Sequence, residues 1–222
     1  MCPAILLSDA SIANGAEPWM VPDVSAIPEI EITHPEALSD SDESFEPYLR
    51  NEETGARRWA IPGTPGLEHR VGGLEKQDIT GDVSYDGPNH QKMLALRAEK
   101  IAKLANVIPP MEVGGDVGAE TLVLGWGGTA GAILSAVERM RGDGVQLSYA
   151  HLRHLNPFPS NLGEILGRYK RVIIPEINSG QLRMLIRGMF LVDARGVNVI
   201  QGRGFHVDEL VEGIQNAMGD KS

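Results

Sequence analysis

The fold is decided by the stretch TLVLGWGGTAGAILSAVERMR, which runs from Thr121 to Arg141. Its opening run of apolar and β-prone residues predicts a buried strand over Thr121–Gly125. A glycine-rich turn follows, and apolar residues then recur at helical spacing, which predicts a helix over Thr129–Arg141. A strand that leads directly into a helix is the repeating unit of α/β folds.

The same alternation continues to the end of the chain. It predicts an α/β domain over residues 120–222, with a mostly parallel sheet, helices on both faces and right-handed crossovers. The further predicted strands are Gln146–Ala150, Arg171–Pro175 and Asn198–Gln201, and the further helices are Ser160–Arg168, Gln181–Leu191 and Val207–Met218.

Upstream of this domain, the pattern predicts one amphipathic helix and a connector over residues 89–119. Asp86-Gly87-Pro88-Asn89 is a typical turn and helix start, and Leu94, Ala98 and Ile101 follow at helical spacing. Leu104 or Ala105 continues this spacing, so we expect one amphipathic helix over about Asn89–Ala105.

The first 88 residues look like pieces of a larger assembly. The apolar run Ala4–Leu7 predicts a buried strand with no neighbouring strand, so we assign residues 1–19 to the tail of a domain that lies elsewhere. Residues 20–88 are rich in proline, glycine and acid, which predicts a long irregular linker. Such a segment is expected to wrap over another surface or another subunit.

Composition excludes several classes of partner. The formal net charge of −10 and the pI of about 5.1 disfavour binding to nucleic acid or to an anionic membrane. Cys2 is the only cysteine, which excludes an intramolecular disulfide, a thiolate-held iron–sulfur cluster and a four-cysteine zinc site. The chain is therefore expected in the cytoplasm, with no membrane-spanning segment.

Polar and glycine-rich segments follow the predicted strands, where an open α/β sheet meets its ligands. The loop Gly125–Gly131 connects a strand to a helix, so its backbone N–H groups could hold a phosphate or a carboxylate. The alternative is a tight turn whose glycines permit close packing. Trp126 lies within this loop.

The segment HLRHLNPFP, which starts at His151, follows the second predicted strand of the domain. His151 and His154 stand three residues apart, but no third ligand of cysteine or carboxylate type lies close in sequence. A structural or substrate-contacting role for His151, Arg153 and Asn156 is therefore favoured over metal binding, and we predict no metal site.

Two further groups of polar residues are candidates. Glu176, Asn178 and Gln181 lie at a strand end and a helix start, where they could orient a ligand or a neighbouring domain. We expect all three to be partly exposed in this chain alone. Ordinary helix capping by Asn178 or its neighbour is the alternative. Glu68 and His69 form an acid–base pair by composition alone, in a glycine-rich segment where a histidine is usually solvated.

Two kinds of enzyme site are disfavoured. Gly142-Asp143-Gly144 opens like a thiamine diphosphate motif, but the window that should supply its asparagine ligand holds Tyr169 to Val172. A helix end and a turn explain these three residues better. No serine lies in a nucleophile-elbow pattern, so a hydrolase has little support.

Several strings taken together resemble the alpha subunits of 2-oxoacid:ferredoxin oxidoreductases, especially the 2-oxoglutarate type. They occur in family order from Leu6 to Phe205, which is nearly the whole chain. The strings are LLSDASIANGAEPW, RRWAIPGTPGLEHRVGGLEK, NHQKMLALRAEKI, LGWGGTAGAI, HLRHLNPFPSNLGEIL, VIIPEINSGQL and QGRGF.

The resemblance implies that residues 1–19 are the tail of a thiamine-pyrimidine-binding domain and that residues 120–222 form a transketolase C-terminal-like domain. It also implies CoA-dependent oxidative decarboxylation of a 2-oxo acid to an acyl-CoA, with electrons passed to ferredoxin. Thiamine diphosphate, magnesium and the iron–sulfur cluster would be held mainly by the beta subunit. No catalytic residue is expected here, and the cofactor-proximal or interface candidates are Glu68, His69, Trp126, His151, Arg153, Asn156, Glu176, Asn178 and Gln181.

The resemblance also implies that the chain acts only with the beta subunit and the remainder of the alpha subunit, and is inactive alone. A stand-alone module that binds a phosphate-bearing ligand such as coenzyme A is one alternative. A non-catalytic truncated subunit is another. The identity of the 2-oxo acid would depend largely on residues outside this chain.

Overall fold

The structure is a computed structural model of the chain, and it describes all residues except 1–2, 9, 17, 39–42 and 220–222. It divides into two compact units. The first unit contains Met1–Ile5 and Glu17–Leu104, and the second contains Leu6–Ala16 and Ala105–Ser222. Each unit is described by itself.

The second unit is built on a five-stranded sheet with the order β1-β3-β2-β4-β5. Strands β2 to β5 pair in parallel, whereas β1 pairs antiparallel with β3 at one edge. The strands are β1 (Val113–Gly115), β2 (Thr121–Trp126), β3 (Ser148–Leu152), β4 (Arg171–Glu176) and β5 (Ala194–Asn198).

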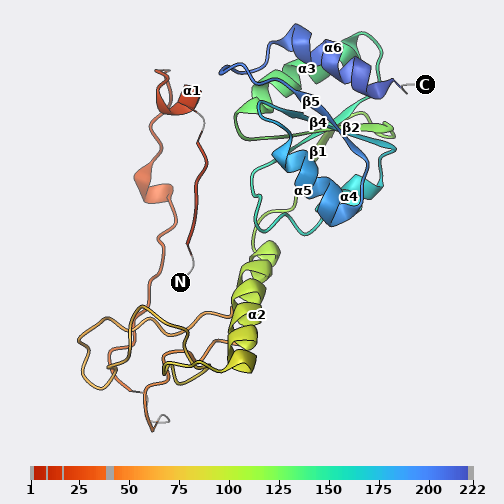
Figure 1. Cartoon of the computed structure of the whole chain (residues 1–222). Coiled ribbons are helices and arrows are strands. Elements are labelled where there is room, and N and C mark those ends of the chain that lie inside the picture. The colour runs from red at the N-terminus through yellow and green to blue at the C-terminus, as the bar shows by residue number, and fades with distance from the viewer. Residues whose placement is uncertain (1–2, 9, 17, 39–42, 220–222) are drawn as a thin grey trace. The chain divides into compact units, whose positions relative to one another are not determined.

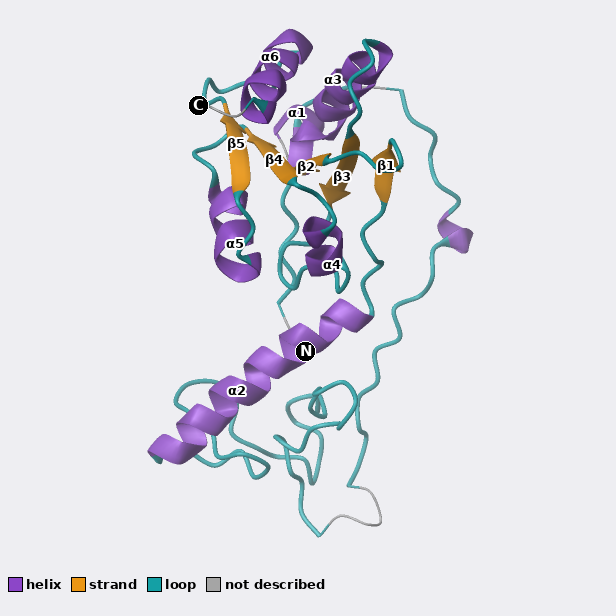
Figure 2. Ribbon diagram, turned by 90° about the vertical axis from the view of Figure 1, so that its right-hand side faces the viewer, coloured by secondary structure: helices purple, strands orange, loops and turns teal. Residues whose placement is uncertain are grey.

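Helices cover both faces of this sheet. Helices α3 and α6 lie on one face, and α4 and α5 lie on the other (Figure 1, Figure 2). The predicted fold class, a mostly parallel sheet between two helical layers, is confirmed. The helices are α3 (Ala130–Gly142), α4 (Leu162–Gly167), α5 (Gln181–Phe190) and α6 (Val207–Met218), and a short 3-10 turn, η3 (Gly127–Thr129), precedes α3.

The core follows from the alternation of side chains along β2, which is buried on both faces. Leu122 and Leu124 point into the cluster under α4 and α5, whereas Val123 points into the cluster under α3 and α6. Each such side chain contributes about 1.5–3 kcal/mol by leaving water. Two apolar layers on one central strand therefore hold the carboxyl ends of the strands in fixed positions.

The last strand of the sheet, β5, lies earlier in the chain than the sequence pattern predicts. The prediction of a strand over Asn198–Gln201 is wrong, because β5 spans Ala194–Asn198 and pairs with β4 from Val172↔Ala194 to Glu176↔Asn198. Arg195 and Gly196 made this stretch look unlike a buried strand. Pairing to β4 overrides that local signal.

β1 was not predicted, because the segment Val113-Gly114-Gly115 is short and glycine-rich. Its approach to β3 is held by the side chain of Asn161. The Asn161 amide donates to the carbonyl of Met111 at 2.9 Å and accepts from the Met111 N–H at 2.9 Å. This pair of hydrogen bonds fixes the connector ahead of β1 against the start of α4.

In the first unit, helix α2 (Gly87–Lys103) confirms the predicted helix, and η2 (Leu104–Asn106) follows it. The side chain of Asp86 accepts a hydrogen bond from the N–H of Asn89 at 2.8 Å, as expected of an N-cap. The apolar residues at helical spacing do not form the covered face of this helix. Met93 is buried, whereas Leu94 is 51% exposed.

The irregular segment ahead of α2 folds locally. Lys76 is only 3% exposed, and its ammonium group donates to the carbonyls of Gly72, Gly73 and Leu74 at 2.7, 2.6 and 3.0 Å. Three isolated bridges add to this, and they are Tyr48↔Ile79, Arg50↔Arg57 and Lys76↔Val83. The segment is irregular, as predicted, but its turns are closed by its own backbone.

The predicted strand Ala4–Leu7 is wrong. These residues are in no strand, and Leu6 and Leu7 are 91% and 64% exposed. A short helix, α1 (Ala10–Ala13), follows, and a 3-10 turn, η1 (Val24–Ala26), lies further on. None of the helices among the described residues is long and apolar enough to cross a membrane.

Candidate functional site

The carboxyl ends of β2 and β4 lie side by side at the centre of the sheet. Their following helices, α3 and α5, lie on opposite faces (Figure 2). This is the switch point where open α/β sheets commonly form a ligand crevice. The residues that follow these two strands are therefore the main candidates for a ligand site.

Glu176 closes this crevice from within. One carboxylate oxygen accepts hydrogen bonds from the N–H of Leu182 at 2.9 Å and from the indole N–H of Trp126 at 3.2 Å. The other oxygen accepts from the N–H of Arg183 at 3.1 Å. One side chain thus joins the end of β2 to the start of α5.

The burial of Glu176 corrects an expectation. A polar group at an open sheet edge was expected to be partly exposed, but Glu176 is 0% exposed. A buried carboxylate is costly unless donors surround it. Here the donors are two N–H groups of the first turn of α5 and one indole, and the helix dipole favours a negative charge at that place.

Asn178 completes the cap. Its side-chain oxygen accepts from the N–H of Gly180 at 2.7 Å and from that of Gln181 at 3.2 Å. Its own carbonyl accepts from the side chain of Asn198 at 2.9 Å. The capping alternative weighed from sequence therefore describes Asn178, and the start of α5 has its backbone donors satisfied by this chain.

Gln181 and Trp126 remain open to solvent. Gln181 is exposed and Trp126 is half-buried. Trp126, Asn178 and the apolar Leu6 and Leu7 of the same unit line a pocket of about 420 Å³. The carboxyl edge of the sheet after β2 and β4 therefore has polar groups that are hydrogen-bonded within the chain, and it has accessible apolar surface beside them.

The loop after β2 is a tight turn. A Cβ on Gly125 would lie 2.5 Å from Cδ1 of Ile133 and 3.0 Å from the ring of His151, so a larger residue would displace these side chains. The hydroxyl of Thr129 donates to the carbonyl of Trp126 at 2.8 Å and therefore does not cap α3. The close-packing alternative holds for Gly125, and the start of α3 has no side-chain cap.

His151 and Arg153 line a pocket of about 530 Å³ beside β3. Burial lowers the pKa of His151, a hydrogen bond to the Gly127 backbone raises it, and the charge of Arg153 lowers it further. The other lining residues are Pro109, Pro110, Met111, Glu112, Val113, Gly114, Ala130, Tyr149, Ala150, His154 and Pro159.

The exposed basic side chains of this pocket have no carboxylate partner in the part of the chain that the structure describes. Arg153 and His154 are exposed, and neither has a hydrogen bond or an ion pair with another described residue. Among the described residues, no three His, Cys, Asp or Glu side chains are placed to hold a metal ion. Asn156 is exposed after β3 and does not line this pocket.

Glu68 and His69 lie in the first unit. Glu68 is exposed, whereas His69 is half-buried and its ring contacts that of Phe45 at a centroid distance of 5.2 Å. A ring nitrogen of His69 is 2.8 Å from the carbonyl of Leu67. The structure thus gives His69 local partners and does not pair it with Glu68.

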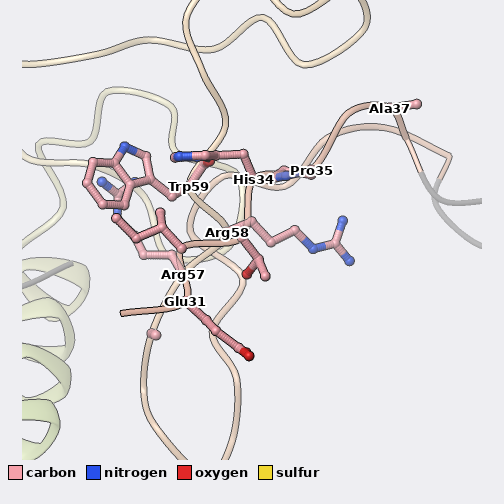
Figure 3. Close-up of a pocket in the computed structure, with 10 residues that line it drawn as sticks. Glu31, His34, Pro35, Ala37, Arg57, Arg58 and Trp59 are labelled. Atoms are coloured by element: carbon pink, nitrogen blue, oxygen red, sulfur yellow. The ribbon is translucent and has the colours of Figure 1, made fainter. Parts of the chain in front are cut away.

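The first unit has its own pocket, of about 710 Å³, and neither Glu68 nor His69 lines it (Figure 3). His34 and Trp59 lie together there, with a ring nitrogen of His34 2.7 Å from the Trp59 carbonyl. Arg57 lies over the Tyr48 ring at 4.3 Å. Aromatic and cationic groups therefore line this pocket, but His34 and Arg57 are engaged within the chain.

Sequence reasoning missed several members of the pocket beside β3. Tyr149 alternates with His151 along the strand, and this period of two was the available signal. Pro109 to Gly114 were missed because the strand they lead into was not predicted. Ala130, at the first position of α3, carries no polar side chain that could have marked it.

The fold and the edge geometry define a class of domain, and a family model agrees. Residues 119–210 match the model described as pyruvate:ferredoxin oxidoreductase core domain II. This stretch contains β2 to β5 and the loops after them. The domain is thus of the kind found in 2-oxo acid:ferredoxin oxidoreductases.

Relatives extend the match beyond that domain. The chain is 48% identical over 220 residues to the 2-oxoglutarate oxidoreductase subunit KorA of Mycobacterium tuberculosis, over 99% of this chain and 33% of the relative. It is 32% identical over 148 residues to subunit alpha of 2-oxoacid:ferredoxin oxidoreductase 1 of Aeropyrum pernix, over 63% of this chain and 23% of the relative. The chain belongs to the family of 2-oxoacid:ferredoxin oxidoreductase alpha subunits.

A solved structure has the same fold. The 2-oxoglutarate:ferredoxin oxidoreductase of Magnetococcus marinus, solved with 2-oxoglutarate, coenzyme A and succinyl-CoA bound, matches with a TM-score of 0.73 and 27% identity. The match covers 82% of this chain and 32% of that chain. The family resemblance stated from sequence is confirmed, and the matches span between 23% and 33% of the length of these proteins.

Proposed function

We propose that this chain is part of the alpha subunit of a 2-oxoglutarate:ferredoxin oxidoreductase. The reaction would convert 2-oxoglutarate and coenzyme A to succinyl-CoA and carbon dioxide, with the electrons passing to ferredoxin. The observation that carries this proposal is the 48% identity to the Mycobacterium tuberculosis KorA subunit over 99% of the chain. The partners would be the beta subunit, the remainder of the alpha subunit and ferredoxin, in the cytoplasm.

The cofactors of the reaction would be held by other chains. Thiamine diphosphate with magnesium supplies carbanion chemistry, and an iron–sulfur cluster carries electrons. Gly142-Asp143-Gly144 is the end of α3 and a turn, with Gly144 at a φ of 87°, which does not fit a diphosphate–magnesium motif. The single cysteine does not fit a cluster ligand set.

The role we propose for this chain is to present a rigid sheet edge to the rest of the complex. Glu176 and Asn178 fix the loop after β4, and Trp126 and Gln181 are the accessible groups beside it. His151, Arg153 and Asn156 extend the edge beyond β3. Glu68 and His69 remain candidates for contacts made by the first unit.

The test is reconstitution. The chain is mixed with the beta subunit and with the remainder of the alpha subunit, and 2-oxoglutarate, coenzyme A, thiamine diphosphate, magnesium and a viologen dye are added. We expect CoA-dependent dye reduction by the mixture and none by this chain alone. The proposal that 2-oxoglutarate is the substrate would be refuted if the subunits assemble stably but reduce the dye only with another 2-oxo acid and not with 2-oxoglutarate.

A further inference from the structure

We propose that the pocket beside β3 binds a small organic anion through a carboxylate or phosphate group held by Arg153, His154 and His151. The proposal does not depend on the oxidoreductase complex. All of its lining residues belong to the second unit of this chain. It can therefore be tested on the chain by itself.

The first observation is that three basic side chains, Arg153, His151 and His154, line one pocket. This grouping contrasts with the overall composition of the chain, which has 30 acidic residues against 20 lysines and arginines. Glu112 is the only acid among the pocket's lining residues, and it is exposed. The guanidinium of Arg153 has no hydrogen bond or ion pair with a described residue, and its charge disfavours protonation of the half-buried His151. An anion bound beside Arg153 would offset that charge and favour the protonated form of His151.

The second observation is a contrast with the start of α5. There Glu176 and Asn178 occupy the backbone donors, so no external anion is needed. At the start of α3 no side chain caps the helix, and its first residue, Ala130, lines the pocket. The dipole of α3 therefore adds to the attraction of the cationic side chains.

The third observation concerns the kind of ligand. A guanidinium presents a planar fork that matches carboxylate or phosphate oxygens. A pocket of about 530 Å³ is of the size that holds small molecules. Its other walls, Pro109, Met111 and Val113, are apolar and would contact the carbon skeleton of the ligand.

The experiment uses NMR of the histidine ring signals of the full chain. Inorganic phosphate and succinate are titrated separately at constant pH and ionic strength, with sodium chloride as the reference for general salt effects. We expect saturable shifts of the His151 and His154 signals with at least one of the two anions, and none for His34. Which anion binds more tightly tells whether the natural ligand carries a phosphate or a carboxylate.

Matched variants decide whether Arg153 is responsible. Arg153→Gln should weaken binding by about ten-fold or more, because it removes a charge-assisted hydrogen bond. Arg139→Gln removes the same charge from an exposed position on α3 that does not line the pocket and should leave affinity within about two-fold. His154→Gln should weaken anion binding by more than Arg139→Gln does and by less than Arg153→Gln does. The absence of saturable shifts with both anions, or equal effects of Arg153→Gln and Arg139→Gln, would overturn the proposal.

Discussion

Polar residues follow both β4 and β3 in the sequence, but within the described part of the chain those after β4 are hydrogen-bonded and the exposed ones after β3 are not. After β4, a buried carboxylate and an amide bind the backbone donors of the next helix, and no donor of that turn is left for a ligand. After β3, Arg153 and His154 have no protein partner among the described residues. Polar residues at a sheet edge can therefore either complete the fold or remain available, and only their partners distinguish the two.

This difference separates stability from binding. Substitutions after β4 should cost stability, since they leave buried donors without acceptors. Substitutions after β3 should leave the fold intact and change only ligand or proton affinity.

The largest effect is expected for Glu176→Ala. It leaves the indole N–H of Trp126 and the N–H groups of Leu182 and Arg183 without an acceptor, which should cost on the order of 3 kcal/mol in the free energy of unfolding. Urea unfolding followed by circular dichroism measures it. Glu176→Gln keeps one acceptor oxygen and should cost less. A loss below about 0.5 kcal/mol for the alanine variant would show that the carboxylate is not structural.

Asn178→Ala should cost about 1 kcal/mol, because it removes the side-chain acceptor of Gly180 and Gln181 at the start of α5. The same unfolding experiment applies. Asn178→Asp retains the acceptor and is the matched control, which should lose much less. If both variants lose the same amount, the cap does not depend on this oxygen.

Gln181→Ala should change stability by only a few tenths of a kcal/mol, because the side chain is exposed. If the edge contacts the beta subunit as proposed, the same change should weaken association by on the order of 1 kcal/mol. Calorimetric titration of the beta subunit into the chain measures this. Gln215→Ala, an exposed glutamine on α6, is the control. Equal affinities of both variants and the unchanged chain would remove Gln181 from the interface.

The smallest effect concerns protons at the end of β3. The pKa of His151 lies below its ordinary value of 6.5, chiefly because the ring is half-buried. The unfolded chain therefore binds more protons, so the stabilisation is present above pH 6.5 and is lost as pH falls through the lowered pKa. Arg153→Gln should raise this pKa, because it removes a repelling charge. An NMR titration of the ring in both proteins tests the direction, and an unchanged midpoint would contradict it.

The sequence predicted the elements whose signals are local. The strand–turn–helix over residues 121–141 and the capped start of α2 were recognisable because periodicity and capping residues lie within a few positions of each other. The family strings likewise marked the loops after β2, β3 and β4. The edge as a whole was therefore predictable.

What was missed depends on partners far away in sequence. The burial of Glu176 requires Trp126, and the position of β5 requires its register with β4. The exposed face of α2 shows the same limit, since Leu94 fits a buried pattern but the first unit packs on Met93. Periodicity predicts which helix face is apolar, whereas packing decides which face is covered.

The hydrogen-bonded pair between Asn161 and Met111 has a consequence for the pocket beside β3. Met111 and Pro159 both line that pocket, and the amide of Asn161, two residues after Pro159, is hydrogen-bonded to the backbone of Met111. The walls are therefore set at a fixed separation before any ligand arrives. Such preorganisation means that little conformational entropy is lost on binding, so even a small anion with few contacts can be held selectively. In an Asn161→Ala variant the pocket walls would become ordered only when the anion binds. The entropy lost in that step would lower the affinity for the anion, although Arg153, His151 and His154 are unchanged.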